Sequence, residues 1–161
     1  MRPRYSRGMA LNLDWLDEIA NEKRVRKLTE DEKSDLAVDR EIQYKAKAWE
    51  FWGDLSDQVE AALDRYNASV PVDYVVRLES FLGGTRWVLN STSPPRRSLT
   101  IQFSFEERRV SCYQLPGKAE QHFHVEVGRD GTLSLTEVVS LEPVAPGGEI
   151  EVILKPFVKG L

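Results

Sequence analysis

The sequence predicts an α+β fold in which a long N-terminal helix packs on one face of a curved antiparallel meander sheet of about six strands. Three observations carry this prediction. Residues 42–66 hold a broad apolar stripe at helical spacing, residues 72–136 alternate between apolar and polar side chains as strands do, and residues 149–161 return to helical spacing. A sheet with one apolar face and helices with apolar stripes bury each other most simply as two layers.

The composition is that of one soluble domain. The chain has 161 residues, of which 41% are hydrophobic and 30% charged, and this length supports a single good core. No apolar run approaches the roughly 20 residues that cross a bilayer, so we expect no membrane contact. A formal net charge of −4 and the lack of a basic face argue against nucleic acid as a partner. A single cysteine excludes an internal disulfide and fits a reducing, cytoplasmic location.

The first residues differ from the rest of the chain. Arg2, Arg4 and Arg7 make a short basic segment, and no apolar stretch of the kind found in secretory signals follows it. We therefore expect residues 1–12 to be a disordered basic tail. Residues 13–161 are then expected to form a single helix-on-sheet domain.

Residues 13–41 are predicted to be helical with little to bury. Leu13, Leu16 and Ile19 give only a narrow apolar stripe, and charged residues dominate after it. Thr29 followed by Glu32 has the spacing of a capping box, which favours a kink or break near 28–30, although Thr29 inside one longer helix has the same spacing. The polar helix around 20–40 is either a solvated surface or an arm that binds a partner protein.

The stripe of the long helix is expected to face the sheet. At 100° per residue, one side collects Ile42, Ala48, Trp49, Trp52, Leu55, Val59, Ala62, Leu63 and Tyr66. The helix should end near Asn67, because Pro71 disfavours helix for the residue before it. Trp49 and Trp52 are expected to lie in the core, so Trp15 and Trp87 remain as candidates for an interface. The protein could therefore be a homo-oligomer.

Strands are expected from residue 72 onward. The expected strands are 72–79, 86–92, 99–105, 109–115, 121–127 and a last one around 133–135. Trp87 and Leu89 share the apolar side of the second strand, and residues 91–97 form an exposed loop. The segment 128–131 has the pattern of a type I turn with a G1 bulge at Gly131, which pairs Val127 with Leu133.

The turn lengths predict how the middle strands pair. A two-residue turn would place Phe105 opposite Val110 and Phe103 opposite Cys112. A four-residue loop would then place Cys112 opposite Phe123. Cys112 is therefore predicted to lie inside the core, where it acts as a small, inert apolar side chain.

The last segment, 149–161, fits two patterns. Ile150, Val152 and Leu154 alternate as in a strand, but a larger apolar set fits helical spacing: Ile150, Ile153, Leu154, Phe157, Val158 and Leu161. The acidic residues of its first turn also suit the helix dipole. We predict a short helix on the same sheet face as the long helix, ending or kinking at Pro156.

The strand registers gather polar side chains on the sheet face away from the helices. The expected members are Thr100, Gln102, Ser104, Arg109, Ser111, Tyr113, His122, His124, Glu126, Ser134 and Thr136. The expected opposite pairs are Arg109 with Glu126, Ser111 with His124, and Tyr113 with His122. Because an antiparallel sheet often leaves one face in water, the simplest interpretation is a solvated surface.

The first functional hypothesis is a non-catalytic ligand-binding or protein-interaction domain that uses this open face or the polar helix around 20–40. Side chains on strands are held rigidly, as a binding site requires. The candidate residues, for an unknown protein or a small polar ligand, are Gln102, Arg109, Ser111, Tyr113, His122, His124 and Glu126.

The alternative is a small metal-dependent or hydrolytic enzyme. His122 and His124 are the only histidines and share a strand face, so with Glu126 they are metal-ligand candidates. Ser111 beside His124 would form a nucleophile and base pair. We expect no cofactor, since the chain has no phosphate loop, nucleophile elbow or dinucleotide fingerprint. The binding hypothesis is therefore favoured.

Overall fold

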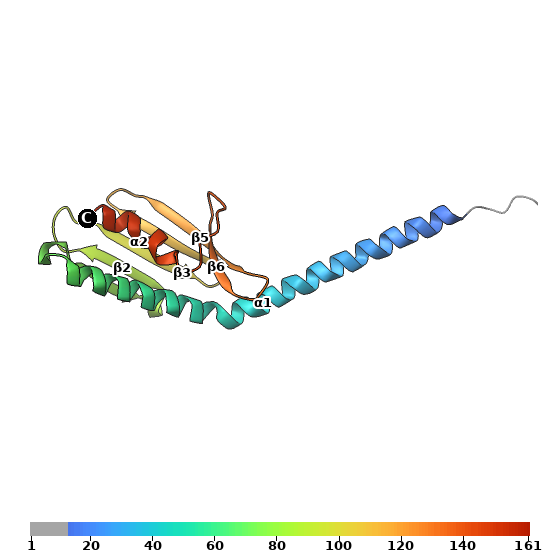
Figure 1. Ribbon diagram of the computed structural model, residues 1–161, viewed down its shortest axis with the longest axis horizontal. Helices are drawn as coiled ribbons and strands as arrows, with labels where there is room; N and C mark the ends of the chain where they lie inside the picture. Colours follow the sequence, from blue (N-terminus) through green and yellow to red (C-terminus); the bar gives the residue numbers. More distant parts are fainter. Residues whose placement is uncertain (1–12) are drawn as a thin grey trace, which may run out of the picture. The chain divides into compact units, whose positions relative to one another are not determined.

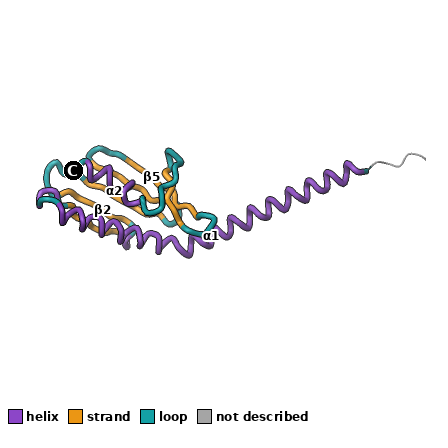
Figure 2. The backbone as a smooth tube through the Cα atoms, viewed as in Figure 1, coloured by secondary structure: helices purple, strands orange, loops and turns teal. Residues whose placement is uncertain are grey.

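A computed structural model describes residues 13–161, and it confirms the α+β fold (Figure 1). The helices and strands are α1 (Asp14–Ser69), β1 (Val76–Phe81), β2 (Arg86–Ser91), β3 (Ser98–Ser104), β4 (Arg109–Leu115), β5 (Glu120–Val127), β6 (Leu133–Glu137) and α2 (Glu149–Lys159). Figure 2 shows the strands side by side, and each pairs antiparallel with the next in the order β1 to β6. The sheet is an open meander, as the sequence predicts.

The chain divides into two units with the boundary between Glu41 and Ile42. In the described part of the first unit, every side chain from Leu13 to Arg40 is exposed. The second unit, Ile42–Leu161, holds all of the residues that are buried within the described range 13–161, and we call it the sheet unit. Within residues 13–161, no helix has both the length and the hydropathy of a membrane span. The expected tail, residues 1–12, lies outside the described residues.

The predicted break near 28–30 is wrong, because α1 runs through this segment as helix. Thr29 does not cap a new helix. Its hydroxyl instead donates to the carbonyl oxygen of Val25 at 3.0 Å, one turn earlier in the same helix. This bond is the usual one for a threonine inside a helix, and it satisfies the hydroxyl that a capping box would have used.

The part of α1 in the sheet unit buries one row of side chains at three- and four-residue spacing: Tyr44, Ala48, Trp52, Leu55, Val59 and Leu63. The predicted stripe was too wide at one edge. Ile42 and Trp49 are 58% and 53% exposed, because they lie roughly 100° around the helix from the centre of the buried row. Tyr44 occupies the core position that the prediction gave to Ile42.

Tyr44 anchors α1 to the loop after β3. Its hydroxyl donates to the Phe105 carbonyl oxygen at 2.5 Å, and the Arg108 guanidinium lies 4.4 Å from the centre of its ring. Burial raises the pKa of Tyr44 to about 12. Trp49 lies beside this anchor and stacks on Phe105, with the ring centres 5.4 Å apart.

Trp52 lies at the centre of the helix–sheet contact. Its ring stacks on Trp87 at 4.1 Å and on Phe103 at 5.2 Å, and its Nε1 donates to the Gly84 carbonyl oxygen at 2.7 Å. Trp87 is therefore buried, and the expectation that it is free for an interface is wrong. Its alternation with Leu89 had already placed it on the core face of β2.

The end of α1 determines where the sheet begins. The helix ends at Ser69, and residues 72–74 form a 3-10 turn rather than the predicted start of a strand. Asn67 is not a C-cap. Its side-chain amide bonds both the N–H and the carbonyl oxygen of Val76, each at 2.9 Å, which fixes the first residue of β1 against the helix.

Two of the predicted registers are wrong by two residues. β3 and β4 pair Phe103 with Val110, and β4 and β5 pair Val110 with Phe123. The connection after β3 is longer than predicted, because the Ser104 hydroxyl accepts the Glu107 N–H at 3.2 Å and holds a four-residue turn. A shift by two residues keeps every side chain on its predicted face.

The hairpin between β5 and β6 confirms its predicted turn. Val127 pairs with Leu133, and Gly131 has φ of 79°, the left-handed conformation that a G1 bulge requires. The Gly128 N–H donates to the Thr132 carbonyl oxygen at 2.8 Å and closes the turn.

The C-terminal segment is a helix, as predicted, but it does not end at Pro156. α2 continues to Lys159. Its buried residues, Ile153, Leu154 and Phe157, belong to the same core cluster as the buried row of α1 and the apolar sheet face. Both helices therefore cover one face of the sheet and leave the other face open (Figure 1).

Cys112 lies in this core, as predicted, and burial raises the pKa of its thiol to about 12. We expect a disulfide reagent at pH 8 to label native Cys112 slowly and urea-unfolded Cys112 rapidly, since only the thiolate reacts. Equal labelling rates would contradict the burial.

The burial of Cys112 also makes the stability of the protein depend on pH. The unfolded thiol ionises near its ordinary pKa of 9.0. Unfolding therefore releases a proton between pH 9 and 12, and the free energy of unfolding should fall as the pH rises through this range.

Candidate functional site

The sheet face away from α1 and α2 is polar. We give the name polar face to a part of this surface, defined by the following polar strand residues: Arg86, Thr100, Gln102, Ser104, Arg109, Ser111, Tyr113, Glu120, His122, His124, Glu126, Ser134 and Thr136. Arg77 and Glu79 of β1 and Asn90 of β2 lie on the same side of the sheet but outside this part. All are exposed or half-buried. All seven candidate residues predicted from the sequence lie on this face.

One row of the polar face crosses four strands. Arg86 pairs with Gln102, Gln102 with Ser111, and Ser111 with His122. The Arg86 Nη2 donates to the Gln102 side-chain oxygen at 3.1 Å. The strand order thus brings together polar groups that are up to 36 residues apart in the sequence.

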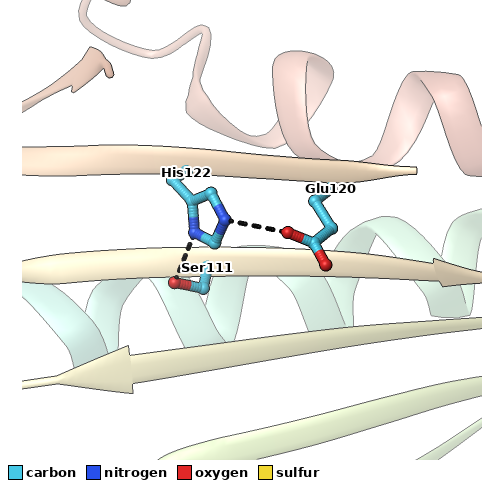
Figure 3. A network of polar contacts seen from close by, with 3 residues as sticks. All are labelled: Ser111, Glu120 and His122. Carbon is cyan, nitrogen blue, oxygen red and sulfur yellow. Dashed lines mark hydrogen bonds and ion pairs between the residues drawn. The ribbon is translucent and has the colours of Figure 1, made fainter. Parts of the chain in front are cut away.

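His122 is held by two polar neighbours (Figure 3). Its Nδ1 lies 2.9 Å from the Ser111 hydroxyl oxygen, and its Nε2 lies 3.4 Å from the Glu120 Oε2. The Gln114 N–H donates to the Ala119 carbonyl oxygen, so these two residues form a hydrogen-bonded pair of β4 and β5. Hydrogen-bonded and non-hydrogen-bonded pairs alternate along an antiparallel ladder, and three steps further on Ser111 and His122 form a non-hydrogen-bonded pair. Side chains approach most closely in such pairs, which explains the short contact.

The register shift changes the neighbours that the sequence predicts. Ser111 faces His122 rather than His124, and Arg109 faces His124 rather than Glu126. Tyr113 faces Glu120 rather than His122. Tyr113 still contacts His122 diagonally, edge to face, with ring centres 5.6 Å apart.

Glu126 lies further along the sheet, opposite Ser134 on β6. Among residues 13–161, no three His, Cys, Asp or Glu side chains gather in a way that could hold a metal ion. His122, His124 and Glu126 therefore do not form a three-ligand centre in the described structure. Instead, His122 uses its nitrogens on Ser111 and Glu120.

Two arginines of the polar face have unsatisfied donors. The Nε atoms of Arg86 and Arg109 are buried, and neither has a hydrogen-bond partner within the described residues. An unpaired buried donor costs about 1–3 kcal/mol, so such atoms are rare in folded proteins. Both belong to guanidinium groups, whose planar forks match carboxylates.

Sequence reasoning missed two members of the site. Arg86 alternates with the apolar Trp87 and Leu89, and this alternation was a sufficient signal to place it on the polar face. Glu120 precedes the predicted start of β5 by one residue. No pattern marked it as part of the strand.

The polar face can therefore donate hydrogen bonds from two arginine forks and position an imidazole between a hydroxyl and a carboxylate. Comparison with known proteins adds no assignment: no protein-family model, curated protein or solved structure matches this chain.

Proposed function

We propose that the sheet unit is a non-catalytic interaction domain whose polar face binds acidic side chains of a partner protein. The observation that carries this proposal is the pair of buried, unpartnered Nε donors of Arg86 and Arg109. Because these Nε atoms are covered and the Arg86 Nη2 donates to Gln102, the arginine side chains would turn toward the partner on binding. A carboxylate would then accept from Nε and a neighbouring Nη together, the bidentate geometry that arginine favours.

The charges on the face support an acidic partner. Glu120 is already engaged by His122 at 3.4 Å, and Glu126 lies opposite Ser134 rather than beside an arginine. The strands of Arg86 and Arg109, β2 and β4, are separated by β3 alone, a spacing of about 9–10 Å. Two acidic groups of one partner segment can therefore reach both arginines.

The shape of the site favours a protein over a small ligand. Small-molecule sites are usually concave, and the hollows of about 520 and 440 Å³ in the sheet unit are lined by neither Arg86, Arg109 nor His122. An open antiparallel face suits a broad protein contact instead.

The first unit offers a second surface for the same function. Its described helix is exposed as far as Arg40 and carries exposed apolar residues, among them Trp15, Leu16 and Ile19. A polar helix with scattered apolar side chains suits partner binding, the second surface of this proposal.

The proposal is tested with a charge-conserving variant. Arg109→Lys keeps the positive charge and removes the Nε donor. We expect it to weaken binding of a glutamate-rich peptide about tenfold, since a hydrogen bond to a charged group contributes about 1.5–3 kcal/mol. Isothermal titration calorimetry at low salt measures the affinity.

The matched control is Arg65→Lys, at an exposed position of α1. It should leave the peptide affinity unchanged. Equal affinity for the native chain and Arg109→Lys would show that the peptide responds to charge alone and would contradict the proposal.

A hydrolytic enzyme is the second candidate, because Ser111, His122 and Glu120 are arranged as a nucleophile, a base and an orienting carboxylate. It ranks below binding for a reason of local structure. Ser111 lies in the middle of β4, paired with Gln102 on one side and His122 on the other. Its strand's backbone donors belong to the sheet ladder, so none is left to stabilise an oxyanion at this position.

A further inference from the structure

We propose that a hollow beside the loop between β2 and β3 binds the phosphate group of a small phosphorylated molecule. The hollow has a volume of about 440 Å³, within the range of about 300–1,000 Å³ typical of small-ligand sites. Its lining residues are Arg77, Glu79, Asn90, Ser91, Thr92, Arg96, Arg97 and Ser98. It is distinct from the arginine pair of the proposed function and does not depend on it.

The fold brings the arginines of this hollow together. Arg77 on β1 pairs with Asn90 on β2, which pairs with Ser98 on β3, so Arg77 lies in the last row that these three strands share before the loop. The loop then turns back over this row and contributes Arg96 and Arg97.

Hydrogen bonds hold the loop in this position. The Arg97 N–H donates to the Ser91 hydroxyl oxygen at 2.7 Å, and the Ser91 N–H donates to the Arg97 carbonyl oxygen at 2.9 Å. The Thr92 hydroxyl donates to the Val75 carbonyl oxygen at 3.0 Å. The arginines are thus carried by a fixed loop and a strand rather than by a free segment.

Their donors are available to a ligand. Within residues 13–161, Arg77 and Arg96 form no ion pair or side-chain hydrogen bond. Arg97 donates one Nη1 bond to the Gly160 carbonyl oxygen, which leaves the other donors of its guanidinium.

The local charge matches a phosphate monoester. Three arginines and one carboxylate, Glu79, line the hollow, which gives a local charge of 3 − 1 = +2. A phosphate monoester carries about −1.5 to −2 at pH 7, and arginine forks bind its oxygens in pairs. A singly charged diester would leave part of the positive charge unmatched.

An adjoining hollow can hold the rest of the molecule. It has a volume of about 520 Å³ and shares Ser91 and Arg97 with the first. Its other lining residues include Tyr74 and the two prolines Pro94 and Pro95. An aromatic ring and proline rings offer apolar contact to the organic part of a phosphorylated compound.

The test measures the binding of defined phosphates by calorimetry at low salt. The probes are inorganic phosphate, phenyl phosphate, methyl phosphate and dimethyl phosphate. We expect methyl phosphate to bind more tightly than dimethyl phosphate, and phenyl phosphate to bind more tightly than methyl phosphate because the second hollow receives the apolar ring. The double variant R77Q/R96Q should weaken methyl phosphate binding at least tenfold. Both positions are exposed, so folding, checked by circular dichroism, should be unchanged.

Two controls distinguish binding in this hollow from general charge attraction and from binding on the polar face. Arg65→Gln removes one exposed positive charge elsewhere on the sheet unit and should leave phosphate affinity unchanged, and Arg109→Gln, in the proposed protein-binding face, should also leave it unchanged. An equal loss in Arg65→Gln would overturn the proposal, because it would show general charge attraction. Loss in Arg109→Gln but not in R77Q/R96Q would also overturn it, by placing the phosphate on the polar face. Absence of phosphate binding would overturn this inference and leave the peptide test of the polar face unaffected.

Discussion

Trp52→Ala is expected to lower the free energy of unfolding by about 3–5 kcal/mol, the range for removing a large buried aromatic side chain. The reason is specific to its place in the fold. Trp52 stacks on Trp87 and Phe103 from the sheet, and its Nε1 donates to the Gly84 carbonyl oxygen at 2.7 Å. The substitution removes the contacts with both rings and one hydrogen bond, and it leaves a cavity between the two layers. Urea denaturation followed by circular dichroism measures the change.

Trp49→Ala is the matched control for this variant. Trp49 lies on the same helix one turn earlier, but it is 53% exposed and covers Phe105 from outside. We expect a loss of about 1 kcal/mol, close to that of an ordinary mutation. Equal losses for the two tryptophans would contradict the observed rotation of α1 against the sheet.

Phe157→Ala is expected to have an effect of similar size, about 3–5 kcal/mol. Phe157 is fully buried and is the last core residue of α2. Its loss removes much of the apolar surface by which α2 packs on the sheet, so the urea midpoint should fall and the helix should exchange its amides faster. Hydrogen exchange read by mass spectrometry follows the second effect.

Lys155→Ala controls for changes in α2 that do not touch the core. Lys155 is exposed and donates to Glu151 on the same helix at 2.9 Å. Helix pairs of this kind contribute only about 0.2–0.5 kcal/mol. A Phe157→Ala protein as stable as Lys155→Ala would mean that α2 does not pack on the sheet.

The two faces of the sheet could be predicted from the sequence, because the alternation assigns each side chain to the correct face even when the strand pairing is wrong by two residues. Phe103, Val110 and Phe123 are buried as predicted, although none of them pairs with the partner expected. A side chain changes face only when the register moves by an odd number of residues. The membership of the polar face was therefore predictable, and its neighbour contacts were not.

The neighbour contacts depend on loop geometry that no alternation encodes. The bond between Ser104 and Glu107 lengthens the turn after β3 and shifts the β3–β4 register. The separate connection between β4 and β5, where the Gln114 N–H donates to the Ala119 carbonyl oxygen, places Ser111 opposite His122 rather than His124. The rotation of α1 was similarly decided by packing, since Tyr44 finds a carbonyl partner at Phe105 that Ile42 could not use.

The phosphate hollow was also beyond sequence reasoning. Residues 91–97 have the composition of an exposed loop, and nothing local indicates that it folds back to place Arg96 and Arg97 near Arg77. That arrangement follows from contacts between Ser91 and Arg97. Arg86 is different, because its alternation with Trp87 was visible in the sequence.

The central claim, that the polar face binds acidic groups through Arg86 and Arg109, is tested most directly by nuclear magnetic resonance of the unmodified protein. The Nε–Hε groups of the arginines are followed while a glutamate-rich peptide is added. The buried, unpartnered Nε donors of Arg86 and Arg109 should shift and reach saturation, while the exposed Arg65 should not move. Uniform, unsaturated shifts of all arginines, or saturation at Arg77 and Arg96 alone, would contradict the claim.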